Sequence, residues 1–214
     1  MIPESLARLV EETRGQRRAE WAGREVWLAN EAWGQLAVSL QGAQVLHYLP
    51  APEAAPAAGA APAGDPAAND MLSDGWLWVT PTPQALPGAI RGGIPLCWPW
   101  FADENTADES TDRSGPMHGP ARKAPWRLDA VDEHEKGVEL HLSPEERLHG
   151  QLVPRAVIQA NARRLHVELI TEHVGETPVK ITGALHSYLA VADAFACRVE
   201  GLAGATYLDK LADF

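Results

Sequence analysis

Cysteine is nearly absent from this chain of 214 residues, which contains two, Cys97 and Cys197. A small secreted domain that depends on disulfides uses more cysteines than this, so we expect both thiols to be reduced. The histidines His134, His141 and His149 lack the tight spacing of a zinc site and have no cysteine pairs beside them. The sequence therefore predicts no disulfide and no metal site.

The chain also lacks a long apolar run and an excess of basic residues. No apolar stretch is long enough to span a bilayer, and residues 1–20 are charged throughout, unlike a signal peptide. Lys and Arg number 18 against 29 Asp and Glu, a formal net charge of −11. That charge disfavours nucleic acid and membrane surfaces as partners. We expect a cytoplasmic protein, and the sequence predicts no particular oligomeric state.

The composition is that of a folded protein, with 45% hydrophobic residues and eight tryptophans. The length suits one domain over residues 1–214. Residues 51–70 are almost entirely Ala, Pro, Gly and Asp. Such a segment buries little apolar surface, so we expect a flexible, dispensable insert within the domain.

The apolar residues change period after the N-terminus. Between Glu4 and Glu20, helix formers and the spacing of Leu6, Leu9 and Val10 predict a short N-terminal helix. Short strand-like runs follow, and a meander begins at Trp126; the runs with strand character are 25–28, 35–40, 44–49, 76–79, 138–142, 165–170 and 179–186. Repeated period-two alternation with little helix between predicts an all-β fold, an antiparallel β-sandwich. The absence of a glycine-rich phosphate loop before a helix makes a nucleotide-binding fold unlikely.

An unusual run of residues stands at 90–101, where Arg91-Gly92-Gly93 precedes a block of prolines and aromatics. Glycines allow the backbone to approach a ligand closely. The aromatic residues Trp98, Trp100 and Phe101 suit either stacking on a ring-shaped ligand or packing in the core, and the sequence leaves both open.

His186 is the strongest candidate for proton transfer. Alternation places it on a polar face with Lys180, Thr182 and Tyr188, opposite Leu185 and its apolar neighbours. A histidine there can give or take a proton near neutral pH. From spacing alone, a solvated surface histidine is the more common outcome.

Two arginines in glycine-containing loops, Arg91 and Arg122, could hold a phosphate through bidentate hydrogen bonds. The alternative is that they pair with the acidic loop at 103–112. Asp209 could accept hydrogen bonds from two sugar hydroxyls or could be an ordinary turn residue.

Three segments together resemble the signature of the D-hexose-6-phosphate mutarotases, a branch of the aldose 1-epimerase family. They are residues 90–101, His118-Gly119-Pro120-Ala121-Arg122, and 182–188 with the later Tyr207-Leu208-Asp209-Lys210. The similarity runs from about Arg24 to Lys210 apart from the insert.

The resemblance implies a galactose mutarotase-like supersandwich and an isomerase of the glucose-6-phosphate 1-epimerase type. Such an enzyme interconverts the α and β anomers of a hexose 6-phosphate, glucose 6-phosphate first, without a cofactor. By the resemblance, His186 is catalytic, while Arg91, His118, Arg122 and Asp209 bind the substrate. The two arginines disfavour an unphosphorylated galactose as substrate.

Two departures from the family stand out. Pro120 occupies the place of the usual aromatic residue after His-Gly, which stiffens that loop. The family's catalytic base is a Glu beyond Tyr-x-Asp-Lys, and this sequence reaches only Phe214. We therefore expect an incomplete C-terminal part. The alternatives are a fragment, which should associate through open sheet edges, and a catalytically reduced sugar-phosphate-binding module.

Overall fold

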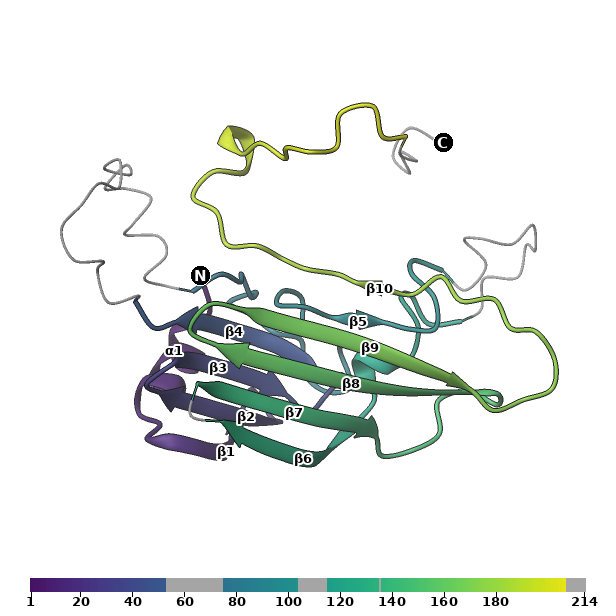
Figure 1. Ribbon diagram of the computed structural model, residues 1–214, viewed down its shortest axis with the longest axis horizontal. Helices are drawn as coiled ribbons and strands as arrows, with labels where there is room; N and C mark the ends of the chain where they lie inside the picture. The colour runs from purple at the N-terminus through teal and green to yellow at the C-terminus, as the bar shows by residue number, and fades with distance from the viewer. Residues whose placement is uncertain (53–74, 104–114, 135, 207–214) are drawn as a thin grey trace.

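The computed structural model describes residues 1–52, 75–103, 115–134 and 136–206, and within them two four-stranded antiparallel sheets dominate (Figure 1). In both sheets the strands follow one another in chain order. The first sheet consists of β1 (Gly15–Trp21), β2 (Arg24–Glu31), β3 (Gly34–Ser39) and β4 (Gln44–Pro50); the second consists of β6 (Trp126–His134), β7 (Gly137–Pro144), β8 (Leu152–Asn161) and β9 (Leu165–His173). The predicted antiparallel sandwich is confirmed.

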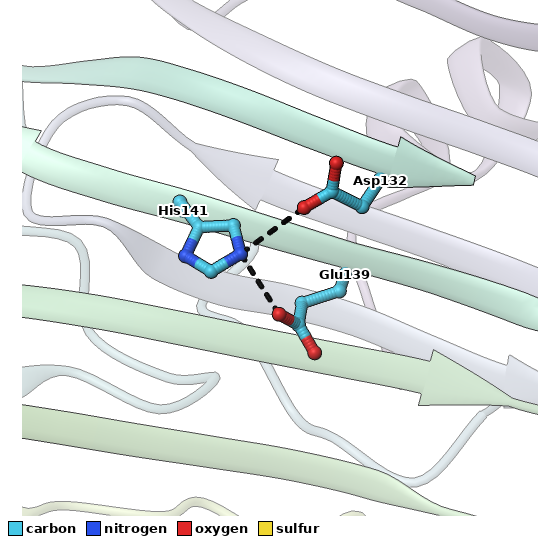
Figure 2. A group of neighbouring side chains, drawn as sticks. All are labelled: Asp132, Glu139 and His141. Carbon is cyan, nitrogen blue, oxygen red and sulfur yellow. Dashed lines mark ion pairs between the residues drawn. The ribbon is translucent and has the colours of Figure 1, made fainter. Parts of the chain in front are cut away.

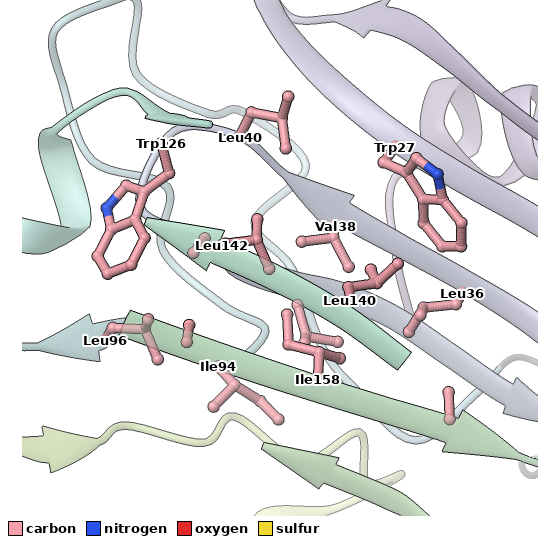
Figure 3. Close-up of a cluster of buried hydrophobic side chains, with 14 of the residues drawn as sticks. Trp27, Leu36, Val38, Leu40, Ile94, Leu96, Trp126, Leu140, Leu142 and Ile158 are labelled. Carbon is pink, nitrogen blue, oxygen red and sulfur yellow. The ribbon is translucent and has the colours of Figure 1, made fainter. Parts of the chain in front are cut away.

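The main core lies between the two sheets (Figure 3). Trp27 and Ala29 of β2 pack there against β7 and β8 residues such as Leu140 and Ile158. The intervening β2 residues, including Leu28, point to the opposite face and join a second apolar cluster. Because both faces of the first sheet are covered, residues 26–29 of β2 are apolar and buried on both sides, whereas β7 alternates buried and partly exposed residues.

The helix α1 (Glu4–Glu11) covers the second face of the first sheet through Leu6 and Val10. The predicted helix between Glu4 and Glu20 is wrong in its second half, because residues 15–21 form β1 instead. Strand pairing with β2 and burial of Trp21 outweigh the helix propensity of this segment.

Four shorter elements lie outside the two four-stranded sheets in the described residues. They are β5 (Leu96–Cys97), β10 (Ala184–Leu185) and the single 3-10 turns η1 (Ala121–Lys123) and η2 (Ala194–Ala196). The predicted strands at 76–79 and 179–186 are mostly wrong, since the first forms only isolated bridges and the second forms the two-residue β10 and an isolated bridge at Thr182. The prolines and glycines of 81–99 interrupt the partner segment, so a continuous ladder does not form.

β10 and the segment after it expose apolar side chains, with Leu185 at 41% and Leu189 at 67% exposure. Residues 191–206 are all exposed and run away from the sheets (Figure 1). Most of the insert at 51–70, Asp209 and nearly all of the acidic loop lie outside the described residues. Within the described part, no helix has the length and apolar character needed to cross a membrane.

A buried histidine links the stability of the sandwich to pH. His47 of β4 is 3% exposed, and its Nε2 lies 3.2 Å from Gln35 Oε1. Burial, assisted by the N-terminal ammonium group, lowers the pKa of His47 to about 4. Its contribution to folding is therefore complete above the ordinary pKa of 6.5 and is lost as the pH falls toward 4.

We predict that this linkage disappears in His47→Gln. Between pH 7 and pH 4.5, wild-type stability should fall by roughly 2–3 kcal/mol more than that of the variant. Urea unfolding at both pH values measures the difference, with His166→Gln on the exposed face of β9 as the control. An identical pH dependence in wild type and His47→Gln would contradict the prediction.

Candidate active site

One pocket of about 450 Å³ gathers four of the five residues that the sequence singles out: Arg91, His118, Arg122 and His186. This volume suits one small molecule. The fifth residue, Asp209, lies outside the described residues, so its place relative to the pocket stays a prediction.

Backbone hydrogen bonds hold His186 in the pocket wall. The N–H of His186 donates to Pro95 O at 3.0 Å, and the N–H of Tyr188 donates to Gly93 O at 2.9 Å. In an extended segment alternate side chains share one side, so His186 and Tyr188 both line the pocket while Leu185 faces solvent. His186 and Tyr188 share a side as predicted, whereas Lys180 and Thr182, expected on the same face, do not line the pocket.

Aromatic rings fix the orientation of the two pocket histidines. His186 stacks on Tyr188 with ring centroids 4.7 Å apart and planes 6° apart. His118 meets His186 edge to face at 5.7 Å, and Phe101 lies 4.8 Å from His118. For the aromatic residues of 98–101 the sequence left open whether they pack in the core or stack on a ligand. Trp98 is buried in the core, whereas Phe101 lies beside the two pocket histidines.

The protonation of His118 follows from one backbone contact. The N–H of Ala102 donates to Nδ1 of His118 at 2.9 Å. An amide N–H can only donate, so Nδ1 is an acceptor and the ring proton resides on Nε2. In this arrangement the Nε2–H of His118 is a hydrogen-bond donor.

Arg122 is a pocket cation whose side chain is not fully hydrogen-bonded by the described residues. It lies in η1, and its Nε is buried without a hydrogen-bond partner in the described structure. A buried donor left unsatisfied costs about 1–3 kcal/mol, and more when it is charged. Neither Arg91 nor Arg122 forms an ion pair with a described residue. An anion in the pocket would satisfy Arg122.

The glycines beside Arg91 serve close packing of the backbone. A Cβ on Gly93 would lie 2.1 Å from Val45 O, and one on Gly92 would lie 2.4 Å from Trp78 O. We expected these glycines to admit a ligand, but the close approach that they allow is to neighbouring backbone segments. They place Arg91 at the pocket by bringing its loop against β4.

Cys97 lies near this site, but its thiol is a poor nucleophile at neutral pH. Burial raises the pKa of its thiol to about 11, although the nearby Arg122 acts in the opposite direction. The thiol is neutral at pH 7, and a neutral thiol is a poor nucleophile. Cys97 and Cys197 are both free, as expected.

A cluster of two carboxylates and a histidine lies elsewhere, on the outer face of β6 and β7 (Figure 2). Nε2 of His141 is 2.8 Å from Glu139 Oε1 and 3.3 Å from Asp132 Oδ2. Both carboxylates thus pair with the same imidazole nitrogen. The cluster shares no residue with the pocket.

Sequence reasoning missed several residues that line the pocket. Tyr188 was predicted to share a face with His186, but it was not assigned to the site. Thr80 and Gln84 come from a loop without periodicity or a motif, so no sequence signal marked them.

The fold agrees with what comparison with known proteins shows. Residues 24–213 match the aldose 1-epimerase family, and the chain belongs to that family. An Escherichia coli K12 protein is 33% identical over 178 residues, which are 82% of this chain and 51% of that protein. A Salmonella typhimurium protein is 36% identical over 146 residues, 64% of this chain and 45% of that protein. Both bear the name "Putative glucose-6-phosphate 1-epimerase".

A solved structure shares the architecture. It is titled the crystal structure of a "putative mutarotase" from Salmonella typhimurium. The TM-score is 0.62 at 25% sequence identity, over 85% of this chain and 54% of that one. The chain therefore spans about half the length of the relatives it matches.

Proposed function

We propose that the pocket binds a hexose 6-phosphate, glucose 6-phosphate first, and interconverts its α and β anomers. The observation that carries this proposal is the buried Nε of Arg122, which has no partner among the described residues. Arg91 lines the same pocket, so two guanidinium groups are available to a phosphate dianion through bidentate hydrogen bonds. The names of the relatives assign the same substrate to those proteins.

The two histidines support the chemical part of the proposal. Mutarotation requires a base that takes the proton of the anomeric hydroxyl and an acid that protonates the ring oxygen. The ring then opens, the C1–C2 bond rotates, and the reverse transfers close the other anomer. In our proposal His186 is the acid, and the Nε2–H of His118 donates to a sugar hydroxyl or the ring oxygen. Only protons move, so no cofactor takes part.

A second candidate is a sugar-phosphate-binding module without turnover. None of the described residues that line the pocket is a carboxylate, so none of them is the acidic base that the family uses. The role of Asp209 as an acceptor for sugar hydroxyls stays a prediction. Anomer exchange measured by NMR separates the two candidates, since both require binding but only the first requires turnover.

Arg122→Ala tests the proposed phosphate site. Removing the guanidinium should weaken glucose 6-phosphate binding by about 1.5–3 kcal/mol, the range for a hydrogen bond to a charged group. Arg91→Ala should have an effect of similar size. Titration calorimetry on the whole chain measures both. Arg127→Ala is the control, because Arg127 is exposed and paired with Asp129 away from the pocket.

The same titrations with glucose distinguish a sugar phosphate from an unphosphorylated sugar. Glucose should bind far more weakly than glucose 6-phosphate, and Arg122→Ala should leave its binding unchanged. Equal affinity for the two sugars, or full glucose 6-phosphate affinity in both arginine variants, would refute the proposed phosphate site.

A further inference from the structure

Arg24 is a buried cation outside the pocket. At the start of β2 it is 2% exposed, and burial lowers the pKa of its guanidinium. Nε donates to Gln41 Oε1 at 2.6 Å and Nη1 to Ala22 O at 2.8 Å. Nη2 donates to Gln84 O at 2.5 Å and to Gly88 O at 2.8 Å. These four acceptors are all neutral oxygens, so the buried charge has no carboxylate among them to offset its desolvation.

Gln41 extends these contacts to a second loop. It is 7% exposed, and its Oε1 is occupied by Arg24. Its Nε2 donates to Gly88 O at 3.2 Å and to Lys123 O at 3.4 Å. Lys123 follows Arg122 within η1. One amide group therefore contacts both the 84–88 loop and the turn that carries Arg122.

The 84–88 loop leads directly to the other arginine. Gln84 lines the pocket, and its carbonyl is held by Arg24. A few residues later, the side chain of Gln44 binds the carbonyls on both sides of Arg91, Ile90 O at 3.4 Å and Gly92 O at 2.6 Å. The backbone that bears Arg91 is thus fixed at both ends of a short segment.

We propose that Arg24 and Gln41 are positioning residues that set the distance between the loops of Arg91 and Arg122, so that both guanidinium groups reach one phosphate. The inference rests on the proposed function of the pocket. Neither residue lines the pocket, so both act on the ligand through the arginines. A buried charge is costly, and fixing two loops of a binding site is the benefit that offsets this cost.

Gln41→Leu and Arg24→Met in the full chain test the inference. Gln41→Leu removes the amide donors and keeps a side chain of similar size, and Arg24→Met removes the guanidinium and keeps an unbranched apolar stem. One guanidinium would then contact the phosphate less well, so we expect glucose 6-phosphate to bind about tenfold more weakly, the low end of the effect of losing a hydrogen bond to a charged group. Calorimetry with glucose 6-phosphate and with inorganic phosphate measures the change. Arg18→Met is the matched control, an exposed arginine of the same sheet whose partner is Glu25.

A variant that lacks both pocket arginines separates a positioning role from a general loss of structure. In a chain that already carries Arg91→Ala and Arg122→Ala, adding Gln41→Leu should cost no further affinity, because the arginines it positions are gone. A purely structural role would lower the residual affinity again. Melting temperatures of all variants accompany the titrations.

Each outcome bears on the inference. Unchanged affinity in both Gln41→Leu and Arg24→Met would overturn it, as would a further loss in the double-arginine background. If Arg24→Met does not fold, Gln41→Leu decides; if neither folds, the pair serves stability and the inference is wrong. Normal affinity in Arg91→Ala and Arg122→Ala would instead overturn the proposed function itself.

Discussion

The rate of anomer exchange of glucose 6-phosphate is expected to fall by about 10²–10⁴-fold when His186 is replaced by Gln. Glutamine keeps a polar side chain in the pocket wall but cannot donate a proton to the ring oxygen and take it back. Glucose 6-phosphate affinity should change little, because the arginines are untouched. Exchange spectroscopy by NMR gives the rate after the spontaneous rate is subtracted.

Leu185→Gln is the matched control for this prediction. Leu185 is the preceding residue, points away from the pocket and is 41% exposed, so the same substituent there should leave the rate unchanged. An undiminished rate in His186→Gln would contradict its role as the acid. A wild-type rate no higher than the spontaneous one, with binding intact, would favour the binding module over the enzyme.

Gly93→Ala should destabilise the protein by about 3 kcal/mol or more and should abolish glucose 6-phosphate binding. Gly93 has φ +61°, and an added Cβ would lie 2.1 Å from Val45 O, so the backbone must move. The carbonyl of Gly93 accepts the N–H of Tyr188, so this movement would also displace the segment that holds His186.

Gly23→Ala separates the clash from the backbone conformation. Gly23 has φ +74°, but a Cβ there meets nothing within 4 Å. Gly23→Ala should therefore lower stability only by the cost of placing alanine in a left-handed backbone conformation, about 1–2 kcal/mol. Its affinity for glucose 6-phosphate should be unchanged. Urea unfolding of both variants gives the comparison. Equal destabilisation by the two substitutions would show that the contact with Val45 does not matter.

The sheets could be predicted because their signal is local. Alternation such as Val138, Leu140 and Leu142 against Glu139 and His141 identifies a strand with one buried face. β1 could not be recognised in this way, because the intrinsic propensity of Arg17 and Arg18 favours a helix. They form a strand because they pair with β2. The long strand expected around His186 failed for a related reason: its partner segment is broken by prolines and glycines that have no periodic signature.

The site residues were predicted from short sequence motifs. A motif identifies residues but does not show which other segments surround them in the fold. His118, Arg122 and His186 were found because each stands in a characteristic short segment. The tautomer of His118 depends on Ala102, and the missing partner of Arg122 depends on burial. Both are properties of contacts between segments, which a linear sequence does not display.

We propose that the two arginines and the two histidines form one sugar-phosphate site. The most direct test follows the imidazole resonances of His118 and His186 by NMR during titration with glucose 6-phosphate and, separately, with glucose. We expect glucose 6-phosphate to shift both resonances along a single saturable curve and glucose to do so only weakly. Arg122→Ala should reduce the response to glucose 6-phosphate. Resonances that do not move, or that respond equally to the two sugars, would contradict this proposal.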